Sequence, residues 1–150
     1  MQISSQTEIK KIPTLYIGEN FYVTLGIDLK TLRLEKRITL NDLSKTLNIS
    51  TTTLRNLEKG KLRKAYNFIH IYCRHFSVNP NQFIKKYNLE CNTLNDKLEY
   101  LKLYYGIKSF KKLDPIIGTY VGGISDYITR NRNKGVEQLI DDRYQEIKKK

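Results

Sequence analysis

The side chains best suited to specific polar contacts gather in residues 40–61, LNDLSKTLNISTTTLRNLEKGK. Hydroxyl, amide and basic groups alternate there with leucine and isoleucine at helical spacing, which places polar and apolar residues on opposite faces. The pattern breaks at Asn48-Ile49-Ser50, and Thr39 and Ser50 are both favourable helix N-caps. The spacing therefore predicts two short helices that meet at a fixed angle, the second with an exposed polar face.

Other residue types that could do chemistry are poorly placed for it. Asp141 and Asp142 are adjacent, so they point to different sides of a helix, and no acidic companion lies at a spacing useful for a catalytic metal. His70 and Cys73 are one helical turn apart, but the sequence lacks a second ligand pair, which favours packing over zinc. No phosphate-binding glycine loop is present. We expect no enzymatic activity, no metal and no cofactor.

The composition favours a polyanionic partner. The 150 residues include 27 Lys and Arg against 15 Asp and Glu, a net charge of +12 that is spread along the chain. Such a field attracts nucleic acid first and an anionic membrane second, although a merely solubilising surface charge is the simpler alternative. No apolar run approaches the ~20 residues of a membrane span, and the start lacks the apolar core of a secretion signal. With only Cys73 and Cys91, we expect cytoplasmic residence and reduced thiols.

The elements that must position the polar face are mostly helical. Residues 1–27 are expected to form an N-terminal arm with a small β-hairpin, because Leu15-Tyr16-Ile17 and Phe21-Tyr22-Val23 flank a loop that contains a glycine. Helical spacing takes over at Asp28, a possible cap. Later helices are expected over residues 39–47, 50–60, 65–76, 80–87, 96–105, 109–117, 124–130 and 135–147, with a linker at 88–95.

The segment from Leu29 to about Phe83 resembles the five-helix DNA-binding domain of the Cro/cI-like (XRE) repressor family, above all in LRLEKRITLNDLSKTLNISTTTLRNLEKGK. Asn48 stands where that family usually has glycine, and asparagine also tolerates a positive φ. Leu40 replaces a glutamine that contacts DNA in many members, so that contact is expected to be missing. The resemblance implies a mainly α protein with a helix-turn-helix domain at residues 28–88.

The resemblance also implies roles for individual residues, because the second helix of such a unit enters the major groove. Arg55 can then bind guanine and Asn56 adenine, whereas a solvated helix face is the alternative. The expected base-reading residues are Thr51, Thr52, Arg55, Asn56 and Lys59, and the expected phosphate contacts are Thr39, Lys45, Ser50, Lys61 and Arg63.

Residues 98–132 more distantly resemble the helix-turn-helix domain of phage cI-type repressors, within a second helical domain expected at 95–150. Asp114 replaces a small apolar residue, Tyr120 replaces a serine cap, and Gly122-Gly123 weaken the second helix. The fold can therefore persist without base reading, and the domain can instead serve dimerisation. If this second domain does read DNA bases, the expected contact residues are Tyr120, Ser125, Thr129, Arg130 and Arg132.

We therefore expect a sequence-specific regulator of transcription that binds double-stranded DNA as a homodimer, of the phage or mobile-element repressor type. The alternative is a protein-interaction regulator whose helical domains bind another regulator or polymerase. Tyr72, Tyr100, Tyr104 and Tyr105 share helical spacing with leucines, which indicates a structural role rather than base stacking.

Overall fold

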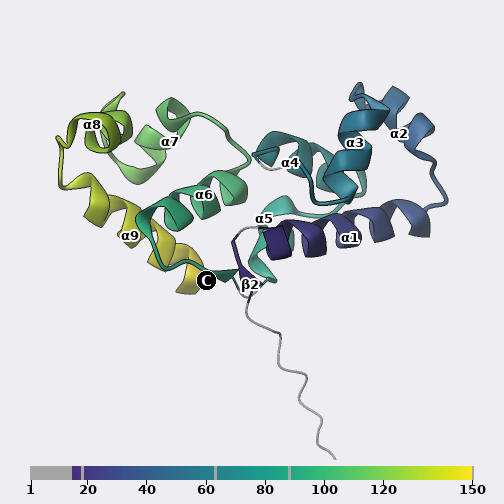
Figure 1. The fold of residues 1–150 in the computed structure, drawn as a ribbon, viewed down its shortest axis with the longest axis horizontal. Coiled ribbons are helices and arrows are strands. Elements are labelled where there is room, and N and C mark those ends of the chain that lie inside the picture. The colour runs from purple at the N-terminus through teal and green to yellow at the C-terminus, as the bar shows by residue number, and fades with distance from the viewer. Residues whose placement is uncertain (1–14, 18, 63, 88, 150) are drawn as a thin grey trace, which may run out of the picture.

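The computed structural model describes residues 15–17, 19–62, 64–87 and 89–149, and these residues form two groups of helices (Figure 1). The first group holds α1 (Glu19–Glu35), α2 (Leu40–Leu47), α3 (Thr51–Glu58), α4 (Tyr66–His75) and α5 (Pro80–Lys85). The second holds α6 (Leu94–Tyr105), α7 (Phe110–Ile117), α8 (Gly123–Arg130) and α9 (Val136–Lys149). Figure 1 shows α2–α3 and α7–α8 along the same edge of the molecule, at the top of the view.

The predicted hairpin is wrong, although a small sheet is present. Strand β2 (Leu15–Tyr16) pairs in parallel with β3 (Leu89–Glu90), not with residues 21–23, which lie inside α1. Phe21, Leu25 and Leu29 recur every four residues and are fully or almost fully buried. Burial on one helix face thus overrides the β-propensity of the local aromatic residues.

Asp28 is likewise not a helix cap. It lies in the middle of α1, where its carboxylate accepts a hydrogen bond from the Tyr87 hydroxyl and lies 3.6 Å from Lys86 Nζ. The helix extends nine residues further toward the N-terminus than predicted, to Glu19. Asp28 therefore fixes α5 against α1.

The other helices agree closely with the predicted ranges. Thr39 Oγ1 accepts from the Asp42 amide at 3.1 Å, and Gly106 ends α6 in the left-handed conformation. Pro80 opens α5 behind the Asn79 cap. Helix α6 begins at Leu94, before the predicted Asp96, because Thr93 caps it by accepting from the Asp96 amide. Local capping chemistry thus sets most of the boundaries.

The two groups of helices share one continuous apolar core. Helix α6 packs on both α4 and α5, and its Leu101 and Leu103 are fully buried. Polar contacts cross the same junction: Tyr22 Oη donates to Glu99 Oε2 at 2.5 Å, and His70 Nε2 lies 2.8 Å from the Leu103 carbonyl oxygen. The predicted linker at 88–95 contains β3 and the cap of α6. The groups are therefore packed together rather than joined only by a chain segment.

Tyrosines contribute substantially to this core. Tyr72 and Tyr100 are 0% and 1% exposed, respectively, while Tyr104 is half-buried and stacks on Tyr100 with ring centroids 6.3 Å apart. These rings have little surface free for base stacking. Among the described residues, no helix combines the length and apolar character that crossing a bilayer requires.

Candidate nucleic-acid interface

The turn between α2 and α3 is built by four buried apolar side chains and two caps. Leu43, Ile49, Leu54 and Leu57 are at most 7% exposed and hold the two helices against each other and the core. Asn48 adopts the left-handed conformation, and its amide donates to the Ser44 carbonyl. Ser50 Oγ then accepts from the Thr53 amide at 3.1 Å, which starts α3.

The opposite face of α3 is open to solvent. Thr52, Arg55 and Lys59 are exposed, and Thr51 and Asn56 are half-buried beside them. The sequence predicts this exposure for the base-reading set, of which four members lie on α3 and Lys59 is the C-cap of that helix. In the described part of the chain, neither Arg55 nor Lys59 forms an ion pair, so both cations are free for an anionic partner.

Four of the five predicted phosphate contacts lie on α2 or in the segments next to α2 and α3. Lys45 and Lys61 are exposed on α2 and just after α3. The hydroxyls of Thr39 and Ser50 are exposed but are also engaged as helix caps. Arg63 lies outside the described residues.

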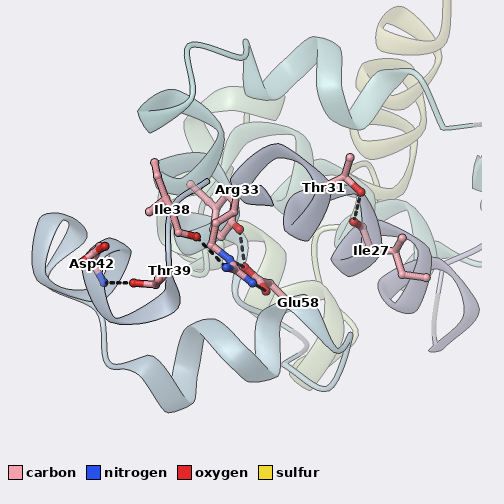
Figure 2. A network of polar contacts seen from close by, with 8 residues as sticks. Ile27, Thr31, Arg33, Ile38, Thr39, Asp42 and Glu58 are labelled. Carbon is pink, nitrogen blue, oxygen red and sulfur yellow. Dashed lines mark hydrogen bonds and ion pairs between the residues drawn. The ribbon is translucent and has the colours of Figure 1, made fainter. Parts of the chain in front are cut away.

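A buried ion pair that sequence reasoning missed sets the position of the end of α3. Arg33 Nε and Nη2 donate to the two Glu58 carboxylate oxygens at 2.7 and 2.8 Å, and Arg33 Nη1 donates to the Ile38 carbonyl at 2.8 Å (Figure 2). Tyr72 Oη also donates to Glu58 at 2.5 Å. The hydrogen bond to Glu58 raises the pKa of Arg33, against the effect of burial. Helices α1 and α4 thus both donate to the Glu58 carboxylate on α3.

The sequence does contain a signal for this pair. Arg33 follows Leu25 and Leu29 at four-residue steps, so it falls on the buried face of α1. A charge on an apolar helix face requires a buried partner, because desolvation without one is costly. The sequence pattern does not identify Glu58 as that partner, because Glu58 is 25 residues away from Arg33.

Close backbone contact between α1 and the end of α3 depends on two glycines. A Cβ at Gly26 would lie 2.4 Å from the Glu58 carbonyl oxygen. A Cβ at Gly60 would lie 2.6 Å from Val23 Cα, and Gly60 has φ of +73°. Absence of a side chain at these positions lets α1 support α3 directly.

The connection between α7 and α8 repeats the backbone geometry of the α2–α3 turn 70 residues later. Gly118 is left-handed and its amide donates to the Asp114 carbonyl, as Asn48 does to Ser44. Leu113 and Ile124 are fully buried at the positions that correspond to Leu43 and Leu54. The family assignment of this second unit stays a prediction.

Asp114 changes the start of the second helix in this unit. Its fully buried carboxylate accepts from the Gly122 amide at 2.7 Å and the Ile124 amide at 3.1 Å. Helix α8 begins at Gly123, whereas the counterpart of Thr51 in this register is Val121, which lies in the preceding turn. The carboxylate therefore occupies the amides that a phosphate would otherwise meet.

The candidate contact residues of the second unit are partly tied to one another. Tyr120 Oη donates to Asp126 at 2.9 Å, and Arg130 Nη1 pairs with the same carboxylate at 2.9 Å. Thr129 Oγ1 donates to the Ser125 carbonyl at 2.7 Å. Ser125, Thr129 and Arg132 are exposed. Asp126 thus adds a negative charge to the face that was predicted to approach DNA.

Both cysteines and His70 are buried, whereas His75 is exposed. Burial raises the pKa of Cys73 to about 12 and that of Cys91 to about 11, which disfavours the reactive thiolate of each. Within the described ranges, no cluster of three or more His, Cys, Asp or Glu side chains could hold a metal ion.

Residues 28–87 match a family model described as the Cro/C1-type HTH DNA-binding domain. No curated protein and no solved structure matches the chain. The matched range contains the turn, the α3 face and the Arg33–Glu58 pair. The chain thus contains a Cro/C1-type helix-turn-helix domain, the type found in DNA-binding regulators, and a further helical region follows it.

Proposed function

We propose that this protein is a sequence-specific regulator of transcription that binds double-stranded DNA, and that it acts as a repressor of the phage or mobile-element type by occupying an operator. One observation carries the proposal. Helix α3 is fixed from behind by Leu54, Leu57 and Glu58, while its outer face presents Arg55 and Lys59 without ion-pair partners among the described residues. The domain match at residues 28–87 supports the same conclusion.

In this proposal α3 lies in the major groove with its N-terminal half toward the base edges. Arg55 donates two hydrogen bonds to guanine O6 and N7, and Asn56 pairs with adenine N6 and N7. Thr51 and Thr52 contact thymine methyl groups, and Lys59 lies at the end of the reading face. Thr39, Lys45, Ser50, Lys61 and Arg63 contact phosphates and set the register without reading sequence.

A homodimer supplies the second half-site. One helix-turn-helix reads few base pairs, so usable specificity normally requires two units about 34 Å apart on the duplex. A palindromic binding site would support this arrangement. DNA binding also favours cytoplasmic residence, where a prokaryotic operator is accessible.

The test is selection of bound duplexes from a random pool at near-physiological salt, followed by affinity measurements on the selected site. An Arg55→Ala variant should lose roughly 1–3 kcal/mol on that site and relax one base position. Arg74→Ala removes the same charge from the exposed surface of α4 and should retain the base preference. If Arg55→Ala changes neither affinity nor preference, α3 is not the reading helix.

Contact between α8 and DNA is a second part of the proposal. Ser125, Thr129 and Arg132 are the side chains open to such contact, whereas Tyr120 and Arg130 would first have to leave Asp126. Two dissimilar adjacent boxes in the selected pool would support two reading units in one chain. A single palindrome would argue against it.

Exposed apolar side chains favour one alternative function, a protein-interaction regulator. Tyr120, Val121 and Ile128 on the α7–α8 unit are 54%, 73% and 44% exposed. In this case the unit binds another regulator or polymerase. The selected DNA pool should then show no base preference. A partner protein should co-purify stably with the parent, and a Val121→Asp variant should abolish its binding. Retention of the partner by that variant would exclude this surface.

A further inference from the structure

A pocket of about 280 Å³ lies where the two groups of helices meet, away from the outer face of α3. Its walls come from the segment that follows α3, the start of α4, helix α6 and the segment that leads into α7. Figure 1 shows these segments between α2–α3 and α7–α8, close to the edge that carries both units. The proposed reading role of α3 does not use this pocket.

Three ammonium groups line the pocket. Lys64 and Lys108 are exposed, and Lys102 is half-buried. Burial lowers the pKa of Lys102, and the charge of nearby Lys64 lowers it further. In the described residues, none of the three lysines forms an ion pair. Three like charges therefore line one pocket without an ion-pair partner among the described residues.

Glu99 does not neutralise the cluster. Glu99 acts on Lys102 through its charge, but its carboxylate is engaged by the Tyr22 hydroxyl at 2.5 Å. The ammonium groups instead lie near aromatic rings: Lys102 Nζ is 3.7 Å from the Phe110 ring centroid, and Lys108 Nζ is 5.6 Å from that of Phe68. These contacts hold the cations beside an apolar wall.

We propose that this pocket binds the phosphate group of a nucleotide, with Lys64, Lys102 and Lys108 as its cationic partners. A single phosphate offers several acceptor oxygens, which match the donors of three ammonium groups. The apolar part of the wall, which includes the half-buried Leu62 and Phe68, suits the attached sugar or base. Both the DNA backbone next to the α3 half-site and a free mononucleotide supply this chemistry.

The experiment compares the full chain with a Lys64→Gln/Lys108→Gln variant. A Lys134→Gln/Lys149→Gln variant loses the same charge from exposed positions before and at the end of α9, and it serves as the matched control. In one arm, inorganic phosphate and AMP are titrated while backbone amide signals of residues 64–68 and 102–108 are followed. In the other, affinity is measured against salt for a duplex limited to the selected half-site and for one extended beyond it.

If the free nucleotide is the ligand, AMP shifts these signals in the parent and the control but not in the pocket variant. If the DNA backbone is the ligand, a result that rests on the proposed function, the parent prefers the extended duplex. The pocket variant then loses that preference, and its slope of log affinity against log salt falls by about 2. The proposal is overturned if the pocket variant equals the parent in both arms, or if the control loses as much. Failure of Arg55→Ala to alter DNA binding leaves the AMP result intact, so the two failures are distinguishable.

Discussion

At the scale of single residues, Glu58 decides how α3 is held. Its carboxylate receives three hydrogen bonds, two from Arg33 and one from Tyr72. Both members of the ion pair are almost fully buried, with side-chain exposures of 8% and 5%. Because the base-reading candidates project from the same helix, any loosening at Glu58 also loosens the surface that we propose faces DNA.

A Glu58→Gln variant should therefore be strongly destabilised. The Arg33 charge would remain buried without a counterion, which costs about 3–5 kcal/mol in comparable buried pairs. The free energy of unfolding from urea titration measures the effect. The matched control is Arg130→Gln, which breaks an exposed pair with Asp126 and should cost less than about 1 kcal/mol. Equal losses in the two variants would show that the buried pair has no special role.

The residues that could be predicted from the sequence act over short distances. Thr39 and Ser50 cap helices through amides three residues ahead, so their roles follow from local spacing. Arg33 and Glu58 come together only when α1 packs on α3, and Gly26 matters for the same reason. Local pattern predicted the outer face of α3, whereas the contacts that support it from behind required the fold.

At the scale of elements, Asp114 shows how one substitution can change a helix start without changing the turn before it. The sequence indicated that this residue was unusual but not that its carboxylate would cap α8. Helix α8 starts later in the register than α3, and the Asp114 cap stands where α3 has its first turn. Gly122 supplies the positive φ of 93° that this later start requires. The effect depends on the local direction of two amides, which spacing alone does not specify.

An Asp114→Ala variant should unfold α8 first. Removal of the carboxylate leaves the Gly122 and Ile124 amides without their acceptor, and we expect a loss of about 2–3 kcal/mol. Hydrogen exchange of the α8 amides is the measurement. Asp114→Asn keeps one acceptor oxygen and should lose less. If the α8 amides stay as protected in the alanine variant as in the parent, the carboxylate is not the cap.

The error at the N-terminus also belongs to this scale. Leu15-Tyr16 does form a strand, but its partner, Leu89-Glu90, lies more than 70 residues away, which no local pattern reveals. Phe21-Tyr22-Val23 satisfies strand propensity, yet Phe21 and Tyr22 are buried as part of a helix. Tertiary packing decided between two periodicities that a few residues could not separate.

At the scale of the whole molecule, His70 links acid stability to the junction between the two groups of helices. Burial lowers its pKa from the usual 6.5, although the hydrogen bond to the Leu103 carbonyl opposes this and nearby Arg74 reinforces it. The unfolded chain therefore binds this proton more readily than the folded chain. The stability that neutral His70 contributes is complete above pH 6.5 and is lost as the pH falls below that value.

A His70→Gln variant should accordingly show a smaller loss of unfolding free energy between neutral and mildly acidic pH. Glutamine retains a side-chain donor for the Leu103 carbonyl but has no proton to gain. His75→Gln changes an exposed histidine on the same helix and serves as the matched control. Urea titrations at a series of pH values provide the comparison. A parent-like pH profile in His70→Gln would assign the acid sensitivity to other groups.

The continuous core predicts that the two groups of helices unfold together, although the sequence suggested separate domains on either side of residues 88–95. Ile140 on α9 is fully buried, so Ile140→Ala should cost about 2–5 kcal/mol. If folding is cooperative across the junction, the slowest-exchanging amides of α3 should lose the same protection as those of α9. Ile128 is 44% exposed, so Ile128→Ala is the control. It should change the protection free energy of the α3 and α9 amides by no more than about 0.5 kcal/mol. If Ile140→Ala lowers the hydrogen-exchange protection of α9 but not that of α3, the two groups of helices are independent folding units. The stability of the α3 face would then not depend on the second group of helices.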